Sequence, residues 1–177
     1  GDAVGQITRE VGSVDILVND AGIFRSTPLL EITAAEWDLM FAVNTRSMLF
    51  TIQATVPHMP GGGRILNMAS MGGKVGEAGQ AHYAASKAAV LALTRVAAIE
   101  LGGRGITVNA ISPGYVATAM GAEGRSEDTV ARWRAASPLG RLATPHDVAA
   151  MAVFVASDES AYCTGQSFDV TGGMIFH

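Results

Sequence analysis

Alternation between strand-like and helical segments is the feature that most restricts how this chain can fold. Short apolar runs, each typical of a buried strand, are separated by longer segments with helical spacing and occupy residues 14–18, 64–69, 106–111 and 167–170. Such alternation predicts right-handed parallel crossovers within one open sheet. We therefore expect an α/β fold with three layers, in which ligands bind beyond the carboxyl ends of the strands.

Helical spacing and capping residues predict where the helices lie. Helices are expected over five segments, namely residues 1–11, 36–56, 82–101, 127–134 and 145–156. Thr33 followed by Glu36 is a capping box that opens the second of these helices. No internal repeat or linker interrupts the pattern, so we expect residues 1–177 to form a single domain.

Composition and charge exclude several classes of function. Apolar residues make up 49% of the chain and charged residues 16%, with a net charge of −4, which gives no surface for nucleic acid or for an anionic membrane. The longest apolar run, residues 148–156, is too short to span a bilayer. The single cysteine, Cys163, allows no internal disulfide, and the four histidines lie at no metal-ligand spacing, so we expect no metal site. These absences, with that of a signal peptide, lead us to expect a cytoplasmic protein.

A tyrosine and a lysine four residues apart are the strongest chemical signal. Tyr83 and Lys87 lie on the alanine-rich helix predicted over residues 82–101, where a spacing of four places both side chains on one face. A phenol titrates near about 10 and is a poor base at neutral pH. A nearby cation lowers that pKa, so the pair predicts a tyrosine able to act as an acid and base.

Two polar residues add to this signal. Ser70 ends a predicted strand, where its hydroxyl could stabilise charge on a substrate oxygen, although a turn serine is the commoner role. Asn44 lies in the middle of a predicted helix, where asparagine is a poor helix former. A buried asparagine needs hydrogen-bond partners, and an ordered water linking it to Lys87 would supply one.

These motifs resemble the short-chain dehydrogenase/reductase family from residue 1 to the C-terminus. The resemblance rests on the segment Asp15–Gly22, on Asn44, Ser70, Tyr83, Lys87 and Asn109, and on the segments Pro113-Gly114, Thr164–Gln166 and Gly172-Gly173. It implies a Rossmann-like, three-layer fold with an open parallel sheet. It also implies an NAD- or NADP-dependent oxidoreductase that acts on a small alcohol or ketone.

The resemblance assigns a role to each matching residue. Tyr83 would be the general acid and base, Lys87 would lower its pKa and bind the nicotinamide ribose, and Ser70 would orient the reacting oxygen. Asn44 would hold a water that relays the proton. The cofactor would be bound by a larger set of residues, namely Asn19, Ala21, Gly22, Tyr83, Lys87, Pro113, Gly114, Val116 and Thr118.

Two features depart from the family pattern. The second asparagine of the family's Asn-Asn-Ala-Gly motif is Asp20 here, which adds a potential charge. The family's opening Gly-rich phosphate loop and the following strand, whose end selects NAD or NADP, have no counterpart, so about two βα units of roughly 30 residues each are missing. We therefore expect a fragment that lacks the N-terminal part of the fold and is weak or inactive alone, with an active parent enzyme.

The loop before the alanine-rich helix limits the classes of substrate that we expect. Glu77, six residues before Tyr83, could accept hydrogen bonds from substrate hydroxyls together with Ser70 and Tyr83, or it could be a solvated loop charge. A polyol or sugar is the expected substrate, and a 3-oxoacyl thioester is the alternative. A non-catalytic binding or assembly module is the competing hypothesis. By resemblance, the helix beginning near Tyr83, or the segment 168–177, would assemble the chain into a homo-oligomer, a dimer or a tetramer.

Overall fold

Four parallel strands form one open sheet at the centre of the molecule. The computed structural model describes residues 2–118 and 126–176. The strands are β1 (Ile16–Asn19), β2 (Arg64–Met68), β3 (Thr107–Pro113) and β4 (Ser167–Val170), adjacent in that order. Every neighbouring pair is parallel, which confirms the predicted α/β sheet.

The strand bounds differ from the predicted ranges by at most two residues, and those of β4 agree with the prediction. The first strand begins at Ile16 rather than at residue 14, and the third runs on to Pro113. Pro113 is tolerated there because it is the last residue of its strand, where no further ladder donor is required of it. It pairs with Val170, and the next amide, that of Gly114, donates to the Val170 carbonyl at 3.0 Å.

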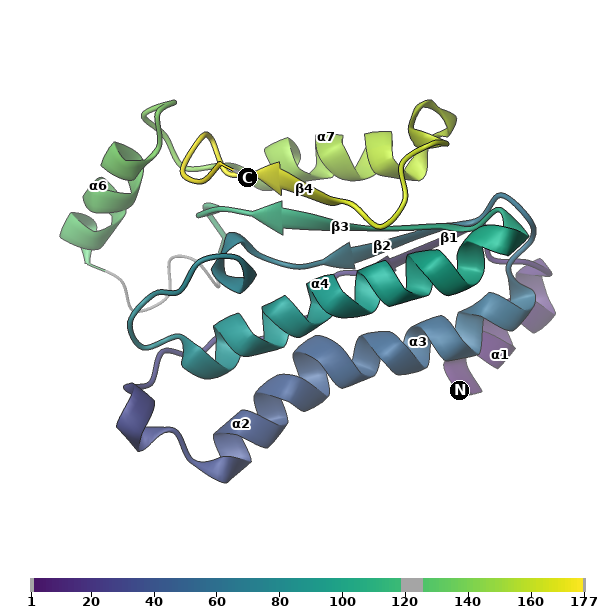
Figure 1. Cartoon of the computed structure of the whole chain (residues 1–177), viewed down its shortest axis with the longest axis horizontal. Coiled ribbons are helices and arrows are strands. Elements are labelled where there is room, and N and C mark those ends of the chain that lie inside the picture. Colours follow the sequence, from purple (N-terminus) through teal and green to yellow (C-terminus); the bar gives the residue numbers. More distant parts are fainter. Residues whose placement is uncertain (1, 119–125, 177) are drawn as a thin grey trace.

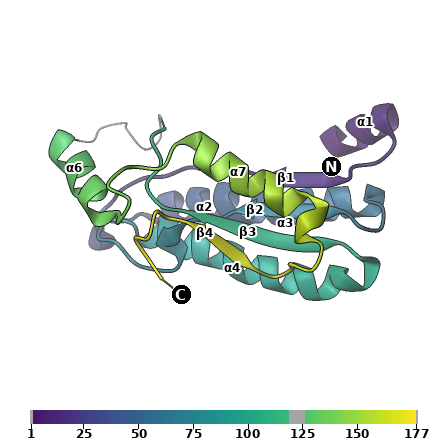
Figure 2. The ribbon, with the colours of Figure 1, turned by 90° about the horizontal axis from the view of Figure 1, so that it is seen from above.

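Helices cover both faces of the sheet and make the three layers (Figure 1). One face is covered by α4 (Ala81–Leu101) and by the long helix that comprises α2 (Ala34–Phe41), the π-helical turn η2 (Ala42–Arg46) and α3 (Ser47–Thr55). The other face carries α7 (Pro145–Ala156), which crosses the sheet in Figure 2. Helix α1 (Asp2–Val11) packs against α3, and α6 (Glu127–Ala136) lies at the end toward which the strand arrows point (Figure 1).

Capping chemistry explains where several helices begin. The predicted capping box of α2 is present, since the Thr33 side chain accepts from the Glu36 amide and the Glu36 carboxylate accepts from the Thr33 amide. Thr144 and Asp147 form a second capping box, with Pro145 in the first helical turn of α7. Short 3₁₀ turns occur at Leu29–Glu31, Val56–His58, Met71–Gly73, Gly102–Arg104 and Asp158–Ser160. None of the helices in the described ranges is long and apolar enough to cross a membrane.

Alternation along the strands divides the core into two sides. On β2, Ile65 joins the cluster formed with α3 and α4, while its neighbour Leu66 joins the cluster beneath α7 with Val155. Successive strand residues point to opposite faces, so this division follows from the pleat. At β1, Ile16 and Val18 are 48% and 49% exposed, and β1 is an edge strand of the sheet.

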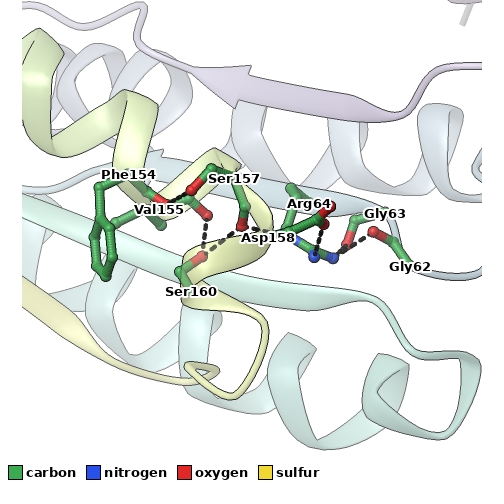
Figure 3. A network of polar contacts seen from close by, with 8 residues as sticks. All are labelled: Gly62, Gly63, Arg64, Phe154, Val155, Ser157, Asp158 and Ser160. Carbon is green, nitrogen blue, oxygen red and sulfur yellow. Dashed lines mark hydrogen bonds and ion pairs between the residues drawn. The ribbon is translucent and has the colours of Figure 1, made fainter.

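A buried arginine at the start of β2 links this strand to the segment that follows α7 (Figure 3). This contact lies at the amino ends of the strands. The Arg64 guanidinium donates to the carbonyl oxygens of Gly62 and Gly63 and, at 3.5 Å, to that of Ser157. It also pairs with the Asp158 carboxylate at 3.1 Å. Since Arg64 is 8% exposed, these partners offset the cost of burying its charge.

Candidate active site

A cavity of about 790 Å³ opens at the carboxyl ends of the parallel strands. Its walls come from the residues that follow β1, β2 and β3, from the first turns of α4, and from α6 and α7. Open parallel sheets place ligands at this end. The cavity is therefore where the predicted chemical residues should meet.

Ser70 and Tyr83 lie on either side of Gly72 at this cavity. Ser70 Oγ accepts a hydrogen bond from the Gly72 amide at 3.1 Å and caps the turn Met71–Gly73. A Cβ added to Gly72 would lie 3.4 Å from Ser70 Oγ and 3.4 Å from Tyr83 Cε1. The Ser70 hydroxyl and the Cε1 edge of the Tyr83 ring thus both lie next to Gly72 at the cavity.

The Tyr83 ring is held by an aromatic neighbour and lies one helical turn from Lys87. Phe24 meets it edge to face, with ring centroids 4.9 Å apart at 79°. Lys87 Nζ lies 5.9 Å from the ring centroid. Both side chains line the cavity, as the spacing of four on one helix face predicts.

Lys87 is a buried cation with a perturbed pKa. The residue is 4% exposed, and its ammonium donates to the Met68 carbonyl at 2.8 Å. Burial lowers the pKa of Lys87 from 10.5 to about 8, against the opposing effect of the Asp20 carboxylate. A lysine ammonium has three donors. The donors not used by Met68 are close enough to the cavity to bind a ligand hydroxyl.

Asn44 sits at the centre of the π-helical turn η2 and is fully buried. Its Oδ1 accepts from the Ile23 amide at 2.8 Å, and its Nδ2 donates to the Ile23 carbonyl at 3.0 Å and to Ser86 Oγ at 3.1 Å. These bonds tie the segment after β1 to α2–α3 and to α4. The sequence marks Asn44 as anomalous in a helix, but the π turn and these partners come only from the structure.

The predicted cofactor residues divide into two groups. Gly22, Pro113, Gly114, Val116 and Thr118 line the cavity together with Tyr83 and Lys87. Asn19 and Ala21 are not among its lining residues, and Asp20 is. The Asn19 side chain instead donates to Asn67 Oδ1 at 2.9 Å and accepts from Thr51 at 2.6 Å, so it braces β1 against β2 and α3.

Two glycines in the lining allow close approach of backbone and side chains. A Cβ at Gly22 would lie 3.3 Å from Asn44 Oδ1 and 3.5 Å from Lys87 Nζ. One at Gly114 would lie 3.1 Å from the Thr171 Cα. A side chain at either glycine would therefore press against these neighbours. The cavity, at about 790 Å³, is large enough for a nicotinamide nucleoside.

Glu77 also lines the cavity. Tyr115 and Trp133, which the sequence did not mark as candidates, line it too. Tyr115 donates to Glu77 Oε2 at 2.9 Å, and its ring stacks on Trp133 with centroids 4.0 Å apart. Tyr115 directly follows the Pro113-Gly114 motif, and that position was the only available signal. No cluster of three His, Cys, Asp or Glu side chains suited to a metal occurs in residues 2–118 and 126–176.

Taken as chemistry, the site offers a hydroxyl donor, a phenol and a buried cation at one cavity. The phenol can exchange a proton with a ligand oxygen, the serine hydroxyl can hydrogen-bond that oxygen, and the cation favours the phenolate. This combination suits proton transfer at a carbonyl or alcohol oxygen.

Comparisons with known proteins agree on one family. The family model described as Enoyl-(Acyl carrier protein) reductase matches residues 1–175. The 3-oxoacyl-(acyl-carrier-protein) reductase FabG of Thermotoga maritima is 39% identical over 176 residues, which cover 98% of this chain and 71% of that protein. The FabG of Staphylococcus epidermidis is 41% identical over 180 residues, covering 98% and 73%. The solved structure of a blue fluorescent protein from a metagenomic library, in complex with NADPH, covers 99% of this chain and 70% of that one, with a TM-score of 0.93 and 39% identity.

Proposed function

Because the chain belongs to the short-chain dehydrogenase/reductase family, we propose that it takes part in hydride transfer between NAD or NADP and a secondary alcohol or ketone. The observation that carries this proposal is that Ser70, Tyr83 and Lys87 line one cavity at the carboxyl ends of the strands. When bound, the nicotinamide supplies or accepts the hydride.

Tyr83 exchanges the proton at the reacting oxygen of the substrate. In the oxidation direction its phenolate would take the proton of the substrate hydroxyl, while the hydride on the carbon that bears this hydroxyl would pass to the bound nicotinamide. In reduction the phenol would return the proton to the carbonyl oxygen. Lys87 favours the phenolate by its charge, and Ser70 Oγ donates to the substrate oxygen. Asn44 holds the segment after β1 in place and, in this proposal, positions a water that carries the proton outward.

The cofactor is bound mainly by residues that follow the strands. Gly22, Pro113, Gly114, Val116 and Thr118 line the cavity. The Lys87 ammonium would donate to the nicotinamide ribose. Asn19 acts indirectly, by holding the end of β1 in place, and Ala21 lies between two residues that line the cavity, Asp20 and Gly22. Support comes from the similar structure that contains NADPH.

A polyol or sugar is the substrate that the site favours. Glu77 is a carboxylate at the cavity, and a carboxylate accepts hydrogen bonds from several hydroxyl groups. A 3-oxoacyl thioester is the second candidate, because the Thermotoga and Staphylococcus relatives are named as 3-oxoacyl reductases.

Assembly into a homo-oligomer is part of the proposal. Small and apolar side chains form an exposed stripe along α4, namely Ala88, Ala92, Val96 and Ile99. Ile99 is 82% exposed, and a partner helix would bury this stripe. Sedimentation that shows a monomer at micromolar concentration would contradict assembly.

The test is a kinetic assay of the full-length gene product with NAD and NADP, on xylitol and on an acetoacetyl thioester. Tyr83→Phe should abolish turnover, because it keeps the ring and removes only the proton-transferring oxygen. Tyr162→Phe is the matched control, since Tyr162 is fully exposed and does not line the cavity. If calorimetric titration shows binding of neither nucleotide, the dehydrogenase proposal is wrong and the non-catalytic module replaces it.

A further inference from the structure

Three side chains from three separate segments meet at one wall of the cavity. Glu77 comes from the loop before α4, Tyr115 from the segment after β3, and Trp133 from α6. The Tyr115 hydroxyl donates to Glu77 Oε2 at 2.9 Å, and its ring is nearly parallel to Trp133, at 12°. Tyr115 therefore makes a polar contact through one end and an apolar contact through its face.

Backbone hydrogen bonds with a neighbouring segment fix the position of Tyr115. Ala143 donates to the Tyr115 carbonyl at 3.0 Å, and Ala117 donates to the Ala143 carbonyl at 2.8 Å. A parallel bridge between Val116 and Ala143 lies between these two bonds. A ring held in this way provides a rigid support for whatever its hydroxyl binds.

Trp133 completes that support from the other side. It is 8% exposed, although it belongs to a short helix whose other described residues are mostly exposed. The Tyr115 ring is thus the surface against which α6 packs its only tryptophan. Both rings line the cavity, so the stacked pair gives it an aromatic wall.

Two side chains of the described residues donate a hydrogen bond to the Glu77 carboxylate, and both donate to the same oxygen. Tyr115 and the Gln80 side-chain amide both donate to Oε2. A carboxylate has about four acceptor positions, shared between its two oxygens. The two hydrogen bonds to Oε2 fix the orientation of the carboxylate. Its other oxygen, Oε1, is then able to accept a hydrogen bond from a ligand.

We propose that Tyr115 determines specificity at this site, by holding Glu77 to accept hydroxyl groups and by packing with Trp133 against the C–H face of a polyhydroxylated substrate. The inference rests on the proposed function and adds to it the residue that selects among alcohols. A carbon chain or ring with adjacent hydroxyls presents both a polar edge and an apolar face. A simple secondary alcohol presents only the apolar part.

The same arrangement disfavours an anionic ligand at this wall. The Glu77 carboxylate repels a phosphate-bearing arm, and the nearby cation of the same loop, Lys74, is paired with Asp169 at 2.6 Å. No lysine or arginine of residues 2–118 and 126–176 forms an ion pair with Glu77. Rejection of one class of ligand by such a charge is a common source of specificity. The acyl thioester alternative therefore serves as an outcome of the test.

The experiment compares the selectivity of the full-length gene product for xylitol over cyclohexanol, as the ratio of the two kcat/KM values. Tyr115→Phe keeps the ring stack and removes the hydroxyl, so the ratio should fall about tenfold, through KM for xylitol rather than kcat. Glu77→Gln should lower the ratio at least as much. The double variant should be no worse than Glu77→Gln alone, because Tyr115 acts through Glu77. Tyr162→Phe, the same chemical change at a fully exposed tyrosine, should leave the ratio unchanged.

The outcomes separate this inference from the proposed function. If the wild type oxidises cyclohexanol but Tyr115→Phe leaves the selectivity ratio unchanged, the inference is wrong and the dehydrogenase proposal stands. Equal losses on both alcohols in Tyr115→Phe also refute it, because they indicate a structural role only. A wild type that reduces an acetoacetyl thioester and ignores xylitol overturns the substrate class. A wild type that oxidises neither alcohol and reduces no ketone overturns both proposals.

Discussion

Replacing Lys87 by methionine should make the folded protein more stable at neutral pH while removing its activity. The Lys87 ammonium is 4% exposed, and burial lowers its pKa from 10.5 to about 8. The folded state thus binds this proton less tightly than the unfolded state does. The resulting cost to stability is fully present below about pH 8 and is relieved as the pH rises from about 8 toward 10.5.

The magnitude follows from those two pKa values. Their difference corresponds to about 3 kcal/mol of unfavourable free energy at pH 7, which falls to about 1 kcal/mol at pH 10. Methionine has a similar length and no charge, so Lys87→Met removes this cost. It also removes the donor to the Met68 carbonyl, which subtracts about 1 kcal/mol. We expect a net gain of about 2 kcal/mol at pH 7 that disappears near pH 10.

Urea unfolding of both proteins without nucleotide, at several values between pH 7 and pH 10, measures this difference. Lys74→Met is the control, because Lys74 is paired with Asp169 at 2.6 Å and its loss should lower the free energy of unfolding at pH 7. A difference between Lys87→Met and wild type that stays constant with pH would refute the reasoning. So would a variant less stable than wild type at pH 7.

Three further predictions concern stability. Arg64→Met should lower the free energy of unfolding by about 2 kcal/mol in chemical denaturation, because three carbonyl groups lose their shared donor. Arg132→Met, on the exposed face of α6, is the control and should change the free energy of unfolding little. Gly73→Ala should lower the free energy of unfolding by about 1–3 kcal/mol, since its Cβ would lie 2.7 Å from the Lys87 carbonyl carbon. Gly76→Ala, whose Cβ would have no atom within 4 Å, should leave the free energy of unfolding unchanged in the same assay. His82→Leu should raise the thermal midpoint, because both buried ring nitrogens have no hydrogen-bond partner among the described residues; a lower midpoint would indicate a bound water.

Much of the fold was readable from the sequence, because it depends on neighbours close along the chain. The order of strands and helices, the capping box at Thr33 and Glu36, and the parallel sheet all follow from periodicity and local hydrogen bonding. Tyr83 and Lys87 share one helix face for the same reason, since a spacing of four is a property of the helix itself. Helix geometry needs no tertiary contact to bring these two side chains together.

Only the tertiary structure decided the surroundings of these residues. Tyr115 and Glu77 are 38 residues apart, and Arg64 and Asp158 are 94 apart, so their contacts depend on the sheet register and on helix packing. The burial that lowers the pKa of Lys87, the π turn at Asn44 and the hydrogen bonds of the Asn19 side chain with Asn67 and Thr51 have the same origin. Residue type and spacing carry local geometry, whereas desolvation and long-range hydrogen bonds exist only once the layers have packed.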